Sequence, residues 1–153
     1  MKIKSFQKDH INLEPGLYLQ ETKQNVDIYD LRFVKPNTRF IPIEAIHTIE
    51  HLFATWLKTE SSIKDKVISF NPGGCQTMFY LEVFNDSDIY LTSEILNCID
   101  WCVKQDTVPG ATAEECGNYK SHDLFCAKQW LQEYREVLNN VRIYTQSPTK
   151  VDI

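Results

Sequence analysis

The stretch Ile46-His47-Thr48-Ile49-Glu50-His51-Leu52-Phe53 decides how this chain is organised. Its apolar residues recur at helical spacing and continue on both sides, which predicts a largely buried helix over 42–58. The apolar positions are Ile43, Ile46, Ile49, Leu52, Phe53, Trp56 and Leu57. On such a helix His47 and His51 lie one turn apart, with Glu50 beside them. The spacing therefore places two imidazoles and a carboxylate on one face.

Two imidazoles one turn apart can bind one cation, and a neighbouring carboxylate can reach the open coordination position. The pattern H-x-x-E-H inverts the H-E-x-x-H order of zinc peptidases and uses the same chemistry. Polar groups on a buried helix are costly unless they are paired or metal-bound, so the apolar flanks favour a metal centre at His47 and His51. The alternative is a surface His/Glu/His face with i,i+4 pairing.

The composition is typical of a globular protein with one domain over 1–153. The formal net charge of -5 and the pI near 5.3 argue against a nucleic-acid partner, which would require a basic face. No apolar run approaches the roughly 20 residues of a membrane span, and Met1 to His10 lacks the apolar core of a signal peptide. The 5 cysteines favour thiols or metal ligands in a reducing cytoplasm over a disulfide framework.

Strand and helix patterns alternate without a regular βαβ order. Strands are expected at 17–19, 26–34, 67–70 and 76–84, and helices at about 42–58, 92–103 and 123–138. Residues 1–10 are expected to be extended, and 147–153 to be a loose tail. The order predicts an α+β fold, in which helices pack on an antiparallel sheet.

A metal held by two His needs a third ligand, for which the cysteines are candidates. Cys98 and Cys102 share a helical face with apolar residues, and they and Cys126 are interpreted as core packing. Cys116 lies in an expected loop before a glycine, where it is either a metal ligand or a structural thiol. Cys75 follows a Pro-Gly-Gly turn that leaves little bulk around its sulfur, which suits a reactive thiol.

Five separated segments carry a further signal. They are Ser5-Phe6 through Asp9-His10, Asp30-Leu31-Arg32-Phe33 with Pro36-Asn37, His47-Thr48-Ile49-Glu50-His51, Gly74-Cys75-Gln76-Thr77 before Phe79-Tyr80-Leu81, and Cys116-Gly117-Asn118-Tyr119-Lys120 before His122-Asp123-Leu124. Together, and in this order, they resemble S-ribosylhomocysteine lyase, the LuxS family. The resemblance implies cleavage of S-ribosylhomocysteine to homocysteine and 4,5-dihydroxy-2,3-pentanedione, the precursor of autoinducer-2, by proton shifts and a β-elimination.

The resemblance also implies residue roles. It implies metal ligands at His47, His51 and Cys116, a general acid/base pair at Glu50 and Cys75, and substrate contacts at Ser5, His10 and Arg32. The metal that it implies is ferrous iron, one ion per subunit, with zinc as a common substitute. The partners that it implies are a small-molecule substrate and a second copy of the chain, in a homodimer with its active sites at the subunit interface.

Some of these residues also have plain structural interpretations. Without the resemblance, Arg32 is equally consistent with a salt bridge on a strand face. Ser5 and His10 are consistent with simply ordering the N-terminal segment. His122 is interpreted as the neighbour of a helix cap rather than as a ligand.

The chain departs from the family around the thiol. The family's usual Ser-Pro-Met-Gly-Cys, followed by Arg or Gln, Thr and Gly, is here Asn71-Pro72-Gly73-Gly74-Cys75-Gln76-Thr77-Met78. An acidic residue often found six positions before the cysteine is replaced by Ser69. These changes bear on substrate affinity and pocket shape, and they leave the implied metal ligands and proton carriers in place.

Three other classes compete with a lyase. An inverted-motif peptidase typically takes its third ligand from a distant Glu in a longer chain, whereas this chain offers Cys116. A structural zinc site is four-coordinate and usually richer in cysteine. The third is a lyase-like protein that binds metal and ligand without turnover, which the altered turn leaves open.

Overall fold

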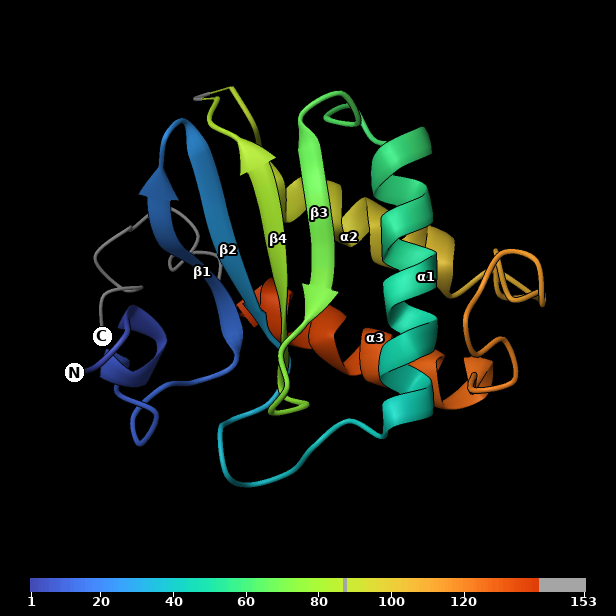
Figure 1. The fold of residues 1–153 in the computed structure, drawn as a ribbon, viewed down its shortest axis with the longest axis horizontal. Coiled ribbons are helices and arrows are strands. Elements are labelled where there is room, and N and C mark those ends of the chain that lie inside the picture. The colour runs from blue at the N-terminus through green and yellow to red at the C-terminus, as the bar shows by residue number, and fades with distance from the viewer. Residues whose placement is uncertain (87, 141–153) are drawn as a thin grey trace.

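The computed structural model describes residues 1–86 and 88–140. Its helical elements are η1 (Lys4–Gln7), α1 (Ile43–Thr59), α2 (Leu91–Cys102) and α3 (Leu124–Asn140), and its strands are β1 (Gly16–Lys23), β2 (Val26–Arg32), β3 (Val67–Pro72) and β4 (Met78–Phe84). The strands form one antiparallel sheet in the order β1-β2-β4-β3. In the view of Figure 1, α2 and α3 pass behind the sheet and α1 stands beside β3. The α+β class predicted from the sequence is confirmed.

Two hairpins set the register of the sheet. Gln24 and Asn25 join β1 to β2, and both have a positive φ, which two-residue hairpin turns require. In the hairpin between β3 and β4, the Gly73 N–H donates to the Met78 carbonyl over 2.9 Å. This second hairpin carries Cys75, which therefore lies at the end of the sheet where β3 and β4 are joined.

The helices cover one face of the sheet. Leu31 and Phe79 pair across β2 and β4, and neither has any exposed surface. Helix α1 contacts β3, α2 and α3, so the helices form one layer. Phe33, just after β2, stacks on Tyr134 of α3 with ring centroids 4.1 Å apart. Apolar burial of this kind, the main favourable term in folding, holds the helix layer against the sheet.

The predicted elements are present, and several of their ends differ. The first strand extends over Gly16–Lys23, while the second stops at Arg32. Cys98 and Cys102 are fully buried in the core, as predicted. In the described part of the chain, no helix is long and apolar enough to cross a bilayer. The expected tail over 147–153 lies outside the described residues.

Two expectations were wrong in detail. Residues 1–10 are not simply extended, because a 3-10 turn forms at η1, where the Phe6 N–H donates to the Ile3 carbonyl over 3.0 Å. Ile43 is 56% exposed, because it lies in the first turn of α1, outside the core stripe. His47 and His51 are half-buried rather than enclosed.

Candidate metal centre and active site

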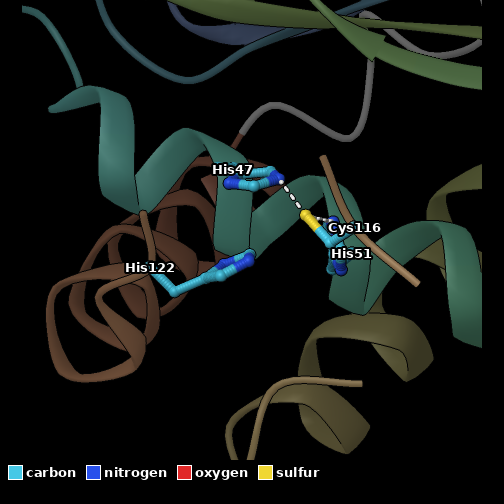
Figure 2. Close-up of side chains that lie close together, drawn as sticks. All are labelled: His47, His51, Cys116 and His122. Carbon is cyan, nitrogen blue, oxygen red and sulfur yellow. Dashed lines mark hydrogen bonds between the residues drawn. The ribbon is translucent and has the colours of Figure 1, made fainter. Parts of the chain in front are cut away.

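Four side chains come together beside α1 (Figure 2). His47 and His51 project from one face of the helix, and Cys116 and His122 come from the segment between α2 and α3. The Cys116 Sγ lies 3.4 Å from His47 Nε2 and 3.7 Å from His51 Nε2. The ligand atoms of all four side chains lie within 4.8 Å of one another. The structure therefore contains a His/Cys group suited to binding a metal ion.

Backbone carbonyls orient both imidazoles on α1. His47 Nδ1 lies 2.8 Å from the Ser121 carbonyl, and His51 Nδ1 lies 2.8 Å from the Pro109 carbonyl. A carbonyl only accepts, so each Nδ1 carries the proton and donates it. Each Nε2 is therefore left with a free lone pair that faces the Cys116 thiol. This is the usual outer-shell arrangement around metal-ligating histidines.

The loop behind His51 leaves little room for a larger residue at Gly110. Gly110 has a φ of +70°, in the left-handed region, and a Cβ placed there would lie 3.3 Å from His51 Nδ1. On the other side of the group, the Asn118 N–H points at Cys116 Sγ over 3.5 Å. The backbone therefore supports a ring at one side and the sulfur at the other.

His122 is the member of the group for which the sequence predicted no ligand role. Its ring stacks on the His47 ring with centroids 4.0 Å apart. Burial, and after it the charges of His47 and His51, lower the pKa of His122 to about 4, so the ring is neutral near pH 7. Its position six residues after Cys116, within the segment that resembles the family, was the available signal.

The interpretation of His122 as a cap neighbour also holds. Asp123 caps α3, because its carboxylate accepts from the Cys126 N–H over 2.9 Å. Thr48 on α1 accepts from the Asp123 N–H over 3.0 Å and bonds His122 Nδ1 over 2.9 Å. The start of α3 is thus attached to α1, and this attachment holds the His122 ring against the group.

The group fits a metal ion on two counts. Imidazole nitrogen and thiolate sulfur are donors that suit zinc and iron. In addition, the Nε2 atom of His122 is buried and has no hydrogen-bond partner within 1–86 and 88–140. A buried polar atom without a partner is costly, and a metal or its bound ligand at this position would satisfy it.

Glu50 faces a cavity beside the histidines. The cavity has a volume of about 320 Å³ and is lined by Glu50, His51, Ala54, Thr55, Phe70, Pro109, Gly110 and Glu115. No described residue donates a hydrogen bond to the Glu50 carboxylate. The carboxylate therefore remains available for proton transfer next to His51.

Cys75 lies in a second cavity. This cavity has a volume of about 330 Å³ and is lined by His10, Arg32, Pro36, Asn37, Thr38, Arg39, Phe40, Cys75 and Thr77. The two cavities share no lining residue. Of the residues for which the resemblance implied substrate contacts, His10 and Arg32 line the Cys75 cavity, whereas Ser5 lies in η1 and lines neither. Within one chain, the Cys75 cavity is therefore separate from the one beside the histidines.

Arg32 takes part in both a salt bridge and a cavity wall. Its Nη2 donates to Asp30 Oδ2 over 2.5 Å, and Lys8 Nζ bonds the same oxygen over 2.8 Å. Its Nη1 donates to Thr77 Oγ1 over 2.9 Å, and that hydroxyl lies 2.9 Å from Cys75 Sγ. Arg32 therefore forms the predicted salt bridge on its strand and also lines the cavity that contains Cys75. The sequence did not single out Thr77, although a residue two positions from the thiol is a natural neighbour at the start of a strand.

Comparison with known proteins identifies the family of the chain. The family model described as S-Ribosylhomocysteinase (LuxS) matches residues 3–144. The S-ribosylhomocysteine lyase of Borreliella burgdorferi is 38% identical over 151 residues, covering 92% of this chain and 94% of that protein. The proteins of the same name from Enterococcus faecalis (36% over 135 residues, 84% and 87%) and Clostridium acetobutylicum (34% over 150 residues, 92% and 93%) are also similar. By this match over nearly its whole length, the chain belongs to the S-ribosylhomocysteinase (LuxS) family.

Proposed function

We propose that this chain is a metal-dependent S-ribosylhomocysteine lyase that releases homocysteine and 4,5-dihydroxy-2,3-pentanedione, the precursor of autoinducer-2. The observation that carries the proposal is the convergence of His47 Nε2, His51 Nε2 and Cys116 Sγ in a chain of this family. The substrate is inferred from the S-ribosylhomocysteine lyases to which the chain is 34–38% identical.

The metal of the proposal is ferrous iron, with zinc as a substitute. His47, His51 and Cys116 would hold it, because their donor atoms are neutral nitrogens with fixed tautomers and a thiol that can ionise. The chemistry that such an ion supplies is Lewis-acid polarisation of the oxygens of the sugar. Three protein ligands leave a position for the substrate, as catalytic metal sites require.

Glu50 and Cys75 are the proposed proton carriers. Moving a carbonyl along a sugar requires protons to be taken from and returned to neighbouring carbons, and two positioned groups can share these transfers. Glu50 lines the cavity beside His51 and has no hydrogen-bond donor among the described residues. Cys75 is solvent-exposed, which lets its sulfur reach a bound sugar. Glu50 would then protonate the departing homocysteine thiolate.

Catalysis by both carriers on one sugar favours a homodimer with its active sites at the interface. One chain places Cys75 and the His/Cys group in separate cavities, which a second copy can bring together. Exposed apolar side chains lie in and near the Cys75 cavity, at Phe40 and Ile43, and at Phe125 in the first turn of α3. Exposed apolar groups of this kind often mark interaction sites. Unpaired thiols at all 5 cysteines support a location in the reducing cytoplasm.

The direct test is thiol release from S-ribosylhomocysteine by protein purified anaerobically with ferrous iron. Release that requires metal and is lost in Cys75→Ala and Glu50→Gln, while both variants keep their metal, supports the proposal. Cys126→Ser is the matched control, because this thiol lies on α3 outside both cavities and should leave activity unchanged. Stoichiometric metal without thiol release would contradict the lyase proposal and favour binding without turnover.

A further inference from the structure

One loop provides much of the wall of the Cys75 cavity. Residues 36–40 all line the cavity, and they belong to the segment 34–41 between β2 and α1, which we call the wall loop. The side chains from Asn37 to Phe40 are exposed. Because the middle of the wall loop is exposed, contacts at its two ends and at its tip determine where the cavity wall lies.

Both ends of the wall loop are bonded to the two residues directly after the thiol. At the start of the loop, the Phe33 and Val34 N–H groups donate to the Thr77 carbonyl over 3.0 and 3.3 Å. At its end, the Ile41 N–H donates to the Gln76 carbonyl over 2.8 Å. The hairpin between β3 and β4 therefore closes the wall loop at its base.

The Gln76 side chain makes a second bond to the same residue. Its Nε2 donates to the Ile41 carbonyl over 2.9 Å, so Gln76 bonds both the N–H and the carbonyl of Ile41. A carbonyl only accepts, so the amide nitrogen of Gln76 must face it. Ile41 is fully buried and directly precedes Pro42, whose carbonyl accepts from the Ile46 N–H over 3.0 Å at the start of α1. The amide thus connects the thiol-bearing hairpin to the helix that carries both histidine ligands.

The backbone of Gln76 is in the left-handed region, with a φ of +63°. Residues with a Cβ are uncommon there, and such a conformation persists where surrounding contacts determine it. Glycine and asparagine adopt it more readily than glutamine does. Glycine has no side chain to donate, however, and the asparagine amide is one methylene shorter. The reach of the side-chain amide, rather than backbone preference, therefore accounts for glutamine at this position.

The tip of the wall loop is held only by exposed contacts. Arg39 makes two contacts with Glu133, of 2.6 and 2.9 Å, and its guanidinium lies 4.5 Å from the centroid of the Trp130 ring. The side chains of Arg39 and Glu133 are 53% and 42% exposed, and exposed pairs of this kind contribute little. The bonds at the base of the loop are therefore the stronger constraint on its position.

We propose that Gln76 is a positioning residue, which fixes the wall of the Cys75 cavity by pairing with Ile41 and so sets the affinity for substrate. This role rests on the proposed function, which places the substrate in that cavity. Gln76 does not itself line the cavity, so it acts through the wall loop. The metal should bind normally without the amide, because other segments orient the rings of His47 and His51.

The first measurement is hydrogen–deuterium exchange of the peptide that contains Ile41, in the zinc-loaded protein. Gln76→Met keeps the length of the side chain and removes its donor. The protected amide of Ile41 should then exchange about tenfold faster, as expected for losing one hydrogen bond at the base of the loop. Gln24→Met is the matched control, because Gln24 also has a left-handed φ, of +50°, and lies in the hairpin between β1 and β2.

The second measurement is steady-state thiol release from S-ribosylhomocysteine by the iron-loaded variants. Gln76→Met should raise KM about tenfold and lower kcat by no more than about twofold, because a displaced wall weakens substrate binding while the reacting groups remain. Metal content should stay at the wild-type level. Gln24→Met should match the wild type in exchange, KM and kcat.

Unchanged exchange at Ile41 in a folded Gln76→Met protein would overturn the inference, as would faster exchange with an unchanged KM in an active enzyme. If Gln76→Met does not fold, Gln76→Asn carries the test, because asparagine accepts the left-handed backbone and its shorter amide does not reach the Ile41 carbonyl. A wild type that binds metal and releases no thiol contradicts the proposed function. The exchange measurement, which needs no turnover, then decides by itself whether Gln76 holds the wall loop.

Discussion

The Met78 side chain occupies the space beside Gly73. A Cβ placed at Gly73 would lie 2.3 Å from Met78 Sδ, and Met78 is 2% exposed at the start of β4. The family pattern stated above has methionine at the first of these positions and glycine at the second. The departures at Gly73 and Met78 are therefore complementary, because the methionine side chain enters the same space from the other end of the turn.

This complementarity predicts strong coupling between the two sites. Gly73→Met alone overpacks the turn and should cost about 1–3 kcal/mol of unfolding free energy, and Met78→Gly alone leaves a cavity at a cost of about 2–5 kcal/mol. The double variant should recover most of both losses. Urea unfolding of the four proteins measures the coupling as a double-mutant cycle. Losses of the two single variants that simply add in the double variant would contradict this coupling. Gly74→Ala is the control, because a Cβ placed at Gly74 meets nothing within 4 Å.

Gly110→Ala should weaken metal binding without unfolding the protein. The added methyl group falls 3.3 Å from His51 Nδ1 at a φ of +70°, so the loop must shift and carry the Pro109 carbonyl away from the ring. Changes in such outer-shell partners typically cost about 10–100-fold in metal affinity. Competition with a chromogenic chelator measures the dissociation constant for cobalt or zinc. Gly117→Ala, beside Cys116 and facing open space, should bind metal normally, and equal affinities for the two variants would argue against this role of Gly110.

Asp30→Asn should be strongly destabilising. The substitution leaves the Lys8 and Arg32 cations buried without a counter-charge, and breaking a buried pair in this way costs about 3–5 kcal/mol. Guanidinium unfolding at constant pH measures the loss. Glu133→Gln provides the contrast, because its bidentate pair with Arg39 is exposed and should contribute no more than about 1 kcal/mol. Similar losses in both variants would contradict a special role for burial.

The protein should lose stability between pH 10 and pH 12 in part through Tyr29. Burial, and after it the charge of Asp27, raises the pKa of Tyr29 to about 12. Below the ordinary value of about 10 both states keep the proton. Above it the unfolded chain ionises first, so stability falls as the pH rises toward 12. Thermal melting across this range should show a smaller loss in Tyr29→Phe, whereas Tyr90→Phe, at an 80% exposed position, should follow the wild type.

Local patterns in the sequence were sufficient for part of the fold and of the site. The i, i+4 spacing of His47 and His51 specifies a shared helical face because helix geometry is local. The apolar stripes around Cys98 and Cys102 marked them as core residues for the same reason. The strands expected at 17–19 and 26–34 are separated by polar residues, and the hairpin turn at Gln24 and Asn25 lies between them. None of these inferences required knowledge of distant contacts.

Contacts between distant residues decided the rest. By itself, the sequence determined the class of fold, the helix that carries two imidazoles, and the family. Only the tertiary structure placed Ser121 and Pro109, which are 74 and 58 residues from the histidines they orient, and brought His122 beside His47. It also connected Arg32 to Thr77 across 45 residues and placed Met78 against Gly73. The physical reason is that hydrogen bonds and packing at these points depend on how loops and strands meet in space, which local propensity does not encode.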